Sequence, residues 1–173
     1  MHILPAFAGI KCFVFDVDGV LTDGSLYLIG NGIMARRMNI KDGYALQLAI
    51  KQGYHILVIS GGDSVEVKDR LRKLGVNEVY MKVSDKVSVL TQCLKKLNVT
   101  QEQVLFMGDD IPDYAAMQIA GLHCCPADAS EDIKQIAHYV SPKAGGMGCV
   151  RDVIEKVLKL NQHWPLDTKI QAR

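Results

Sequence analysis

Residues 10–24 read IKCFVFDVDGVLTDG. The run from Ile10 to Val17 is short, rich in β-branched and aromatic residues, and bounded by aspartate and glycine, which is typical of a buried β-strand. The carboxylates of Asp16 and Asp18 therefore fall where this strand ends. In an α/β sheet, ligands bind beyond the carboxyl ends of the strands, so we expect these two side chains to lie in a binding site.

Outward from this stretch, strand patterns alternate with helical periodicity. The further predicted strands are Tyr54–Ile59, Glu78–Met81, Val104–Met107, Leu122–Cys125 and Tyr139–Val140. The predicted helices are Asp42–Gln52, one capped by Asp63 or Ser64 that runs to Leu74, Ser84–Leu97, one entered through Pro112, Ser130–Ala137 and Cys149–Leu160. Segments Ser25–Ile29 and Ile33–Met38 flank Gly30-Asn31-Gly32 and predict a small β-hairpin. Such alternation predicts an α/β three-layer sandwich with a mostly parallel, Rossmann-like central sheet.

Carboxylates gather behind two of the predicted strands. Segments 16–23 and 109–113 hold six of the 19 acidic residues, where an even distribution would place about 1.4. Turn-forming, solvated aspartate is the alternative for Asp23 and Asp113. The remaining cluster needs a compensating cation, and an all-oxygen site favours Mg²⁺ over zinc.

Such a site suits phosphoryl transfer. A carboxylate can attack phosphorus to form an aspartyl-phosphate, and a second carboxylic acid can serve as general acid and then as general base. Ser60 offers a hydroxyl and Lys86 a point charge for the transferred phosphoryl. The alternatives are an ordinary turn at Ser60-Gly61-Gly62 and a solvated lysine at position 86, although the first turn of a helix is electrostatically unfavourable for lysine.

These residues carry a family resemblance. Asp16-Val17-Asp18-Gly19-Val20-Leu21-Thr22, then Ser60, then Lys86, then Gly108-Asp109-Asp110-Ile111-Pro112-Asp113 resemble the four ordered motifs of the haloacid dehalogenase-like phosphohydrolases. The resemblance implies that Asp16 is the nucleophile and Asp18 the acid/base. It further implies that Mg²⁺ is held by Asp16, the backbone carbonyl of Asp18 and Asp109, with Asp110 and Asp113 in support.

A narrower resemblance covers about residues 9–160. Motifs around Asp18–Gly24, Lys41-Asp42-Gly43, Ser60-Gly61, Asp128-Ala129 and Gly145–Arg151 are similar to those of the 3-deoxy-D-manno-octulosonate 8-phosphate phosphatases. This group implies a haloacid dehalogenase-like fold without a large cap, a role in lipopolysaccharide biosynthesis, and homotetramers whose neighbouring subunits complete each site. It makes Ser60, Gly61, Lys86 and Arg151 the substrate-binding residues. One departure is Gly62, because this group usually has arginine there.

Length, charge and cysteine content limit the kinds of protein that this chain can be. With 173 residues, the chain is expected to form one phosphatase domain, 1–173, with a core over about 9–160 and a tail over 161–173. A net charge of +1 argues against nucleic-acid binding. Five cysteines without a C-x-x-C pair suggest reduced thiols, and no apolar run is long enough to span a membrane. We therefore expect a soluble, cytoplasmic protein.

The leading hypothesis is a Mg²⁺-dependent phosphomonoesterase that hydrolyses the eight-carbon sugar acid phosphate through an aspartyl-phosphate. The alternatives are a phosphatase of a nine-carbon keto-deoxy sugar acid 9-phosphate and a non-catalytic, tetramerising regulatory module. The apolar hairpin over residues 27–37 predicts a homotetramer with the hairpins at the subunit interface, although such a hairpin could instead cover its own sheet.

Overall fold

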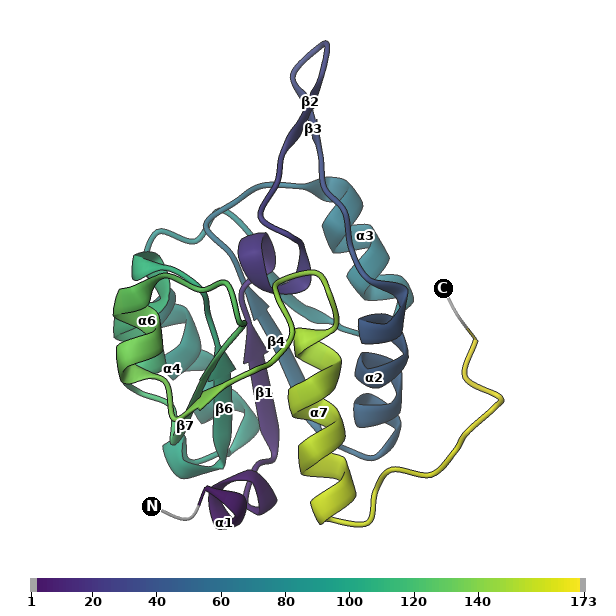
Figure 1. Ribbon diagram of the computed structural model, residues 1–173, viewed down its shortest axis with the longest axis vertical. Coiled ribbons are helices and arrows are strands. Elements are labelled where there is room, and N and C mark those ends of the chain that lie inside the picture. The colour runs from purple at the N-terminus through teal and green to yellow at the C-terminus, as the bar shows by residue number, and fades with distance from the viewer. Residues whose placement is uncertain (1–2, 172–173) are drawn as a thin grey trace.

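A six-stranded parallel sheet forms the centre of the protein (Figure 1). The computed structural model describes residues 3–171. The strand order is β5-β4-β1-β6-β7-β8, with bounds Cys12–Phe15 for β1, His55–Ile59 for β4, Glu78–Tyr80 for β5, Val104–Met107 for β6, Leu122–Cys125 for β7 and Tyr139–Val140 for β8. The chain winds outward from β1 in one direction and then returns to wind outward in the other. This is the doubly wound arrangement whose reversal point lies beside the first strand.

Helices cover both faces of the sheet. Strand side chains alternate between the two faces, so Phe13 and Phe15 pack on one side and Cys12 and Val14 on the other. The first side is covered by α1 (Leu4–Ala8), α2 (Ile40–Lys51), α3 (Val65–Lys73) and α7 (Cys149–Leu160). The second is covered by α4 (Lys86–Leu97), α5 (Tyr114–Met117) and α6 (Glu131–Ile136). The predicted α/β sandwich is therefore confirmed.

Several element ends differ from the predicted ones, each for a local reason. The first strand ends at Phe15, because the chain then enters a tight turn, η1 (Val17–Leu21), whose backbone is not helical at Asp18 and Gly19. The helix expected from Ser84 begins at Lys86, since the Asp85 side chain accepts a hydrogen bond from the Ser88 amide and caps it. The helix expected at Pro112 is a 3₁₀ turn, η3 (Ile111–Asp113), followed by the short α5. A second 3₁₀ turn, η2 (Gln101–Gln103), precedes β6.

The predicted hairpin stands clear of the sheet. Its strands β2 (Tyr27–Ile29) and β3 (Ile33–Ala35) pair antiparallel, and the ribbon projects beyond the sandwich (Figure 1). Because it projects, the hairpin does not cover its own sheet.

The C-terminal segment after α7 runs along α2 (Figure 1). The Tyr44 hydroxyl donates to the carbonyl of Asp167, and the Lys51 ammonium pairs with the Asp167 carboxylate. Among residues 3–171, no helix has the length and apolar character needed to cross a membrane.

Candidate active site

The carboxyl ends of three neighbouring strands bring the acidic segments together. Asp16 follows β1, Asp109 follows β6 and Ser60 follows β4, and β1 lies between the other two strands. A cavity of about 360 Å³ opens there. Of the predicted site residues, it is lined by Asp16, Asp18, Ser60, Gly61, Lys86 and Asp109. The sequence motifs, which are as much as 93 positions apart, thus meet at one edge of the sheet.

The turn after β1 is built around Gly19. Its φ is +89°, and a Cβ at this position would overlap the Asp109 carboxylate. Only glycine therefore fits between the two acidic segments. The buried Thr22 hydroxyl accepts hydrogen bonds from the amides of Gly19 and Gly24, both at 3.3 Å, which holds the turn closed. This turn fixes the position of Asp16 relative to Asp18.

Lys86 is buried and joins two carboxylates. Its ammonium lies 2.9 Å from Asp16 Oδ1 and 2.7 Å from Asp113 Oδ1. Burial acts to lower the pKa of Lys86, but the charges of Asp113 and Asp16 outweigh it and the pKa is raised. A solvated role for this lysine, and for Asp113, is excluded by these contacts. The two ion pairs also offset the unfavourable position of a cation at a helix N-terminus.

Asp16 and Asp109 lie in a crowded, acidic environment. Burial, followed by the charge of Asp113, raises the pKa of Asp16 to about 7, against the pull of Lys86. Burial, Asp113 and Asp16 together raise the pKa of Asp109 to about 7. Their ionised forms therefore need a compensating positive charge.

The oxygens available suit a hard divalent cation. One carboxylate oxygen from each of Asp16, Asp109 and Asp113 lies within 4.8 Å of the others. Both oxygens of Asp113 already accept hydrogen bonds, one from Lys86 and one from the Asp109 amide at 3.1 Å. Asp16 and Asp109 are thus the carboxylates best placed to hold the ion, and their oxygens match the preference of Mg²⁺.

Ser60 lines the cavity from the end of β4. Its hydroxyl oxygen is buried and accepts a hydrogen bond from the Gly62 amide at 3.1 Å. The hydroxyl hydrogen is therefore directed elsewhere and can be donated to an anion in the cavity.

Arg36 is a site residue that the sequence analysis missed. Its Nε lies 2.6 Å from Asp18 Oδ1, and its Nη2 lies 3.3 Å from Asp18 Oδ2, which is a two-point ion pair. Arg36 stands at the base of the hairpin next to Arg37, and the pattern Arg36-Arg37 does not reveal which of the two faces the site. Arg37 instead pairs with Asp23 at 2.8 Å.

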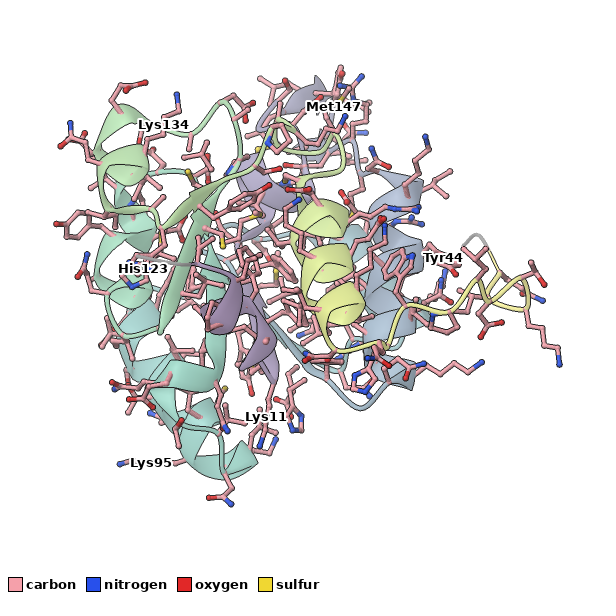
Figure 2. All side chains as sticks on the ribbon, turned by 60° about the horizontal axis from the view of Figure 1, so that its bottom comes forward. Lys11, Tyr44, Lys95, His123, Lys134 and Met147 are labelled. Atoms are coloured by element: carbon pink, nitrogen blue, oxygen red, sulfur yellow. The ribbon has the colours of Figure 1, made fainter. Side chains whose placement is uncertain are left out.

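Arg151 lies outside this cavity, and the loop before it packs on the turn after β1. The Arg151 guanidinium stacks on the rings of Tyr44 and Trp164 and pairs with Glu155 at 3.1 Å, outside the cavity of Asp16. Gly145 and Gly146 pack on the backbone of the turn after β1, where the Gly146 amide donates to the carbonyl of Val20 at 2.9 Å. The loop thus backs the catalytic turn within one chain. Figure 2 shows Met147 of this loop at the opposite end of the molecule from Lys11 and Lys95.

Comparison with known proteins agrees with this geometry. Residues 71–154 match the family model described as haloacid dehalogenase-like hydrolase. The chain is 36% identical over 156 residues to the 3-deoxy-D-manno-octulosonate 8-phosphate phosphatase KdsC of Escherichia coli K12, which covers 90% of this chain and 83% of that protein.

Solved structures of phosphatases of this name are also similar to this chain. The phosphatase of that name from Yersinia pestis superposes with a TM-score of 0.91 at 32% identity, covering 93% of this chain and 87% of that one. The enzyme from Moraxella catarrhalis, solved in complex with a magnesium ion, a phosphate ion and a KDO molecule, has a TM-score of 0.88 at 32% identity over 91% of each chain. The chain thus resembles these phosphatases over most of its length and in its whole fold.

Proposed function

This chain belongs to the haloacid dehalogenase-like hydrolase family, and we propose that it is a Mg²⁺-dependent phosphomonoesterase that hydrolyses 3-deoxy-D-manno-octulosonate 8-phosphate to the free sugar acid and phosphate. The observation that carries this proposal is that Asp16 and Asp109, at the ends of the adjacent strands β1 and β6, line one cavity with Lys86 at the start of α4. Similarity to named phosphatases of this substrate over about nine-tenths of the chain supports the same conclusion.

Asp16 acts as the nucleophile in this proposal. Its carboxylate oxygen forms a bond to phosphorus as the bond from phosphorus to the sugar oxygen breaks, giving an aspartyl-phosphate. A bound Mg²⁺ would supply positive charge that offsets the repulsion between the two anions. The Lys86 ammonium and the Ser60 hydroxyl hold the transferred phosphoryl oxygens as they rearrange.

Asp18 moves the protons. It donates one to the leaving sugar oxygen, then takes one from the water that attacks phosphorus and releases phosphate from Asp16. Its side chain is 35% exposed, which supports this role because protons and water can reach it.

Assembly and location follow as further parts of the proposal. The side chains of Tyr27, Leu28, Ile29, Ile33 and Met34 on the hairpin are 45% to 80% exposed. A two-stranded ribbon with so much exposed apolar surface suits an interface, and we place the hairpins at the contacts of a homotetramer. We also place the segment Gly145–Arg151 near the substrate, since Gly145 and Gly146 pack on the turn after β1. Five buried, unpaired cysteines suit the reducing cytoplasm.

The experiment that tests this function is a phosphate-release assay with purified protein and Mg²⁺. It compares the eight-carbon acid 8-phosphate, a nine-carbon keto-deoxy acid 9-phosphate and glucose 6-phosphate. We expect the highest kcat/KM with the eight-carbon substrate. A higher value with the nine-carbon acid would reassign the substrate, and no release from any ester would favour a regulatory module.

A further inference from the structure

The catalytic scheme above assigns no role to the Arg36–Asp18 ion pair, although this pair engages the side chain of the proposed acid/base. The guanidinium binds both carboxylate oxygens of Asp18, at 2.6 and 3.3 Å. Its side chain is only 4% exposed, and Nη1 also donates to the carbonyl of Met34 at 3.2 Å. Each carboxylate oxygen has a second lone pair, so Asp18 can keep this ion pair and still meet the leaving oxygen of a substrate. The two-point contact therefore fixes how the Asp18 side chain is turned.

Arg36 also borders a second cavity, beside the one that takes the phosphoryl group. This cavity, of about 370 Å³, lies between the hairpin base and α3, and its wall includes Met34, Arg36, Met38, Glu66 and Arg70. A guanidinium has five N–H donors, and the contacts to Asp18 and Met34 use three of them. The remaining edge of Arg36 can therefore bind an anion in this second cavity.

Gly62 leaves the space that the pair occupies. A Cβ at this position would lie 2.8 Å from Asp18 Oδ2 and 3.3 Å from Arg36 Nη2. A larger residue would thus compete with the guanidinium for the same place. In this chain the guanidinium of Arg36, at the base of the hairpin, reaches Asp18 through the space that a side chain at position 62 would fill.

We propose that Arg36 is a positioning and specificity-determining residue: part of its guanidinium orients Asp18, and the remaining N–H donors bind the carboxylate of the substrate. This inference rests on the proposed function, because it requires a substrate that carries both a phosphate ester and a carboxylate. Phosphate esters without a carboxylate lack the second contact and turn over slowly.

The test compares two substrates in three proteins. The substrates are 3-deoxy-D-manno-octulosonate 8-phosphate and glucose 6-phosphate, which both release a primary sugar hydroxyl but differ in the carboxylate. The proteins are the wild type, Arg36→Met and the matched control Arg37→Met, which removes the neighbouring exposed arginine. The measured quantity is the ratio of the two kcat/KM values, with kcat and KM also determined separately.

We expect Arg36→Met to lower this ratio at least about ten-fold. Loss of the contact to Asp18 slows both substrates and cancels in the ratio, whereas loss of the partner for the carboxylate slows only the sugar acid phosphate. Arg37→Met leaves the ratio at the wild-type value, and Arg36→Lys, which keeps the charge without the two-point geometry, gives an intermediate ratio. A smaller change in Arg36→Met, or an equal loss with both substrates, would show a merely structural role and overturn the inference. Absence of any preference in the wild type would instead overturn the proposed function.

Discussion

The side chains of the active site interact through charge at short range. Five carboxylates line the cavity together with the cation of Lys86, and Arg36 binds one of them, that of Asp18. The five are Asp16, Asp18, Asp109, Asp110 and Asp113. Burial, together with the excess of acids over cations, raises the pKa values of Asp16 and Asp109 and creates the need for a divalent ion. Each cation is bound to a carboxylate that takes part in the proposed reaction. We therefore expect substitutions of these charged residues to change the reaction rate more than the free energy of unfolding.

The acid/base role of Asp18 can be tested by Asp18→Asn. The variant keeps the backbone carbonyl that is proposed to bind the metal, so Mg²⁺ affinity should remain at the wild-type level. Loss of proton transfer should lower kcat about 10²–10⁴-fold. Steady-state kinetics with a Mg²⁺ titration measure both effects. Weak metal binding together with a normal rate at saturating Mg²⁺ would show that the role is wrongly assigned.

Site residues that directly follow strands can be predicted from the sequence. Site residues that reach the cavity from other elements, such as the hairpin, cannot. Asp16, Ser60 and Asp109 were identified because the carboxyl ends of parallel strands meet at one edge. The position of Arg36 depends on how far the hairpin base lies from β4, which no local pattern encodes. Arg151 lies outside the cavity for a similar reason, because stacking between Tyr44 and Trp164 depends on where the C-terminal segment runs.

Among the elements, α7 begins without a cap of its own. Its N-cap is Gly148, with φ +104°, and this residue has no side chain to accept a hydrogen bond. Asp42 of α2 supplies the acceptor instead, since its Oδ1 lies 2.7 Å from the Arg151 amide. Its Oδ2 is buried with no hydrogen-bond partner in the described part of the chain, and burial raises the pKa of Asp42 to about 6. The cap thus places a carboxyl group in a buried position.

Two substitutions of Asp42 distinguish its role as a helix cap from the effect of its buried charge. Asp42→Ala removes the acceptor and should lower the free energy of unfolding by about 1 kcal/mol. Asp42→Asn keeps an acceptor oxygen without a buried charge and should lose less stability at pH 8, where the wild-type carboxyl group is ionised. Urea unfolding of the three proteins measures this. Equal losses in the two variants would contradict a capping role.

Element positions could be predicted from the sequence in outline. The strands Val104–Met107, Leu122–Cys125 and Tyr139–Val140 and the helix Cys149–Leu160 have the predicted bounds, because apolar runs end there at turn residues. The bounds near Asp16 and Pro112 were wrong by a few residues. Both segments bend sharply to present carboxylates to the cavity, so the demands of the site override local propensity.

In the molecule as a whole, the carboxylates of the site connect metal binding to stability. The pKa values of Asp16 and Asp109, about 7 in the folded protein without a cation, exceed the ordinary value of 3.8. The folded state therefore binds more protons than the unfolded state between about pH 4 and 7, and these two groups lower the free energy of unfolding as the pH rises through that range. A divalent cation bound to the ionised groups removes this cost.

Calorimetry can check this dependence. We expect Mg²⁺ to raise the Tm, relative to protein in EDTA, more at pH 8 than at pH 5, because protons compete with the ion at low pH. Asp109→Asn should reduce the rise at pH 8 since it removes one ligand. An equal rise in Tm at both pH values would contradict binding through these carboxylates.

The exposed hairpin predicts the state of assembly. Leu28, the middle residue of β2, is 80% exposed, and Leu28→Asp should dissociate the proposed tetramer without unfolding the sandwich. Light scattering gives the mass and a parallel assay gives kcat/KM, with Leu166→Asp as a control at an exposed apolar residue outside the hairpin. Wild-type protein that is monomeric and fully active would refute the assembly.

The covalent role of Asp16 is the central claim, and Asp16→Asn tests it most directly. The amide has the same shape but is a poor nucleophile, so the variant should fold with a wild-type circular dichroism spectrum and show no steady-state hydrolysis of 3-deoxy-D-manno-octulosonate 8-phosphate at saturating Mg²⁺. Multiple turnovers by this variant, with asparagine at position 16 verified by mass spectrometry, would contradict the aspartyl-phosphate mechanism.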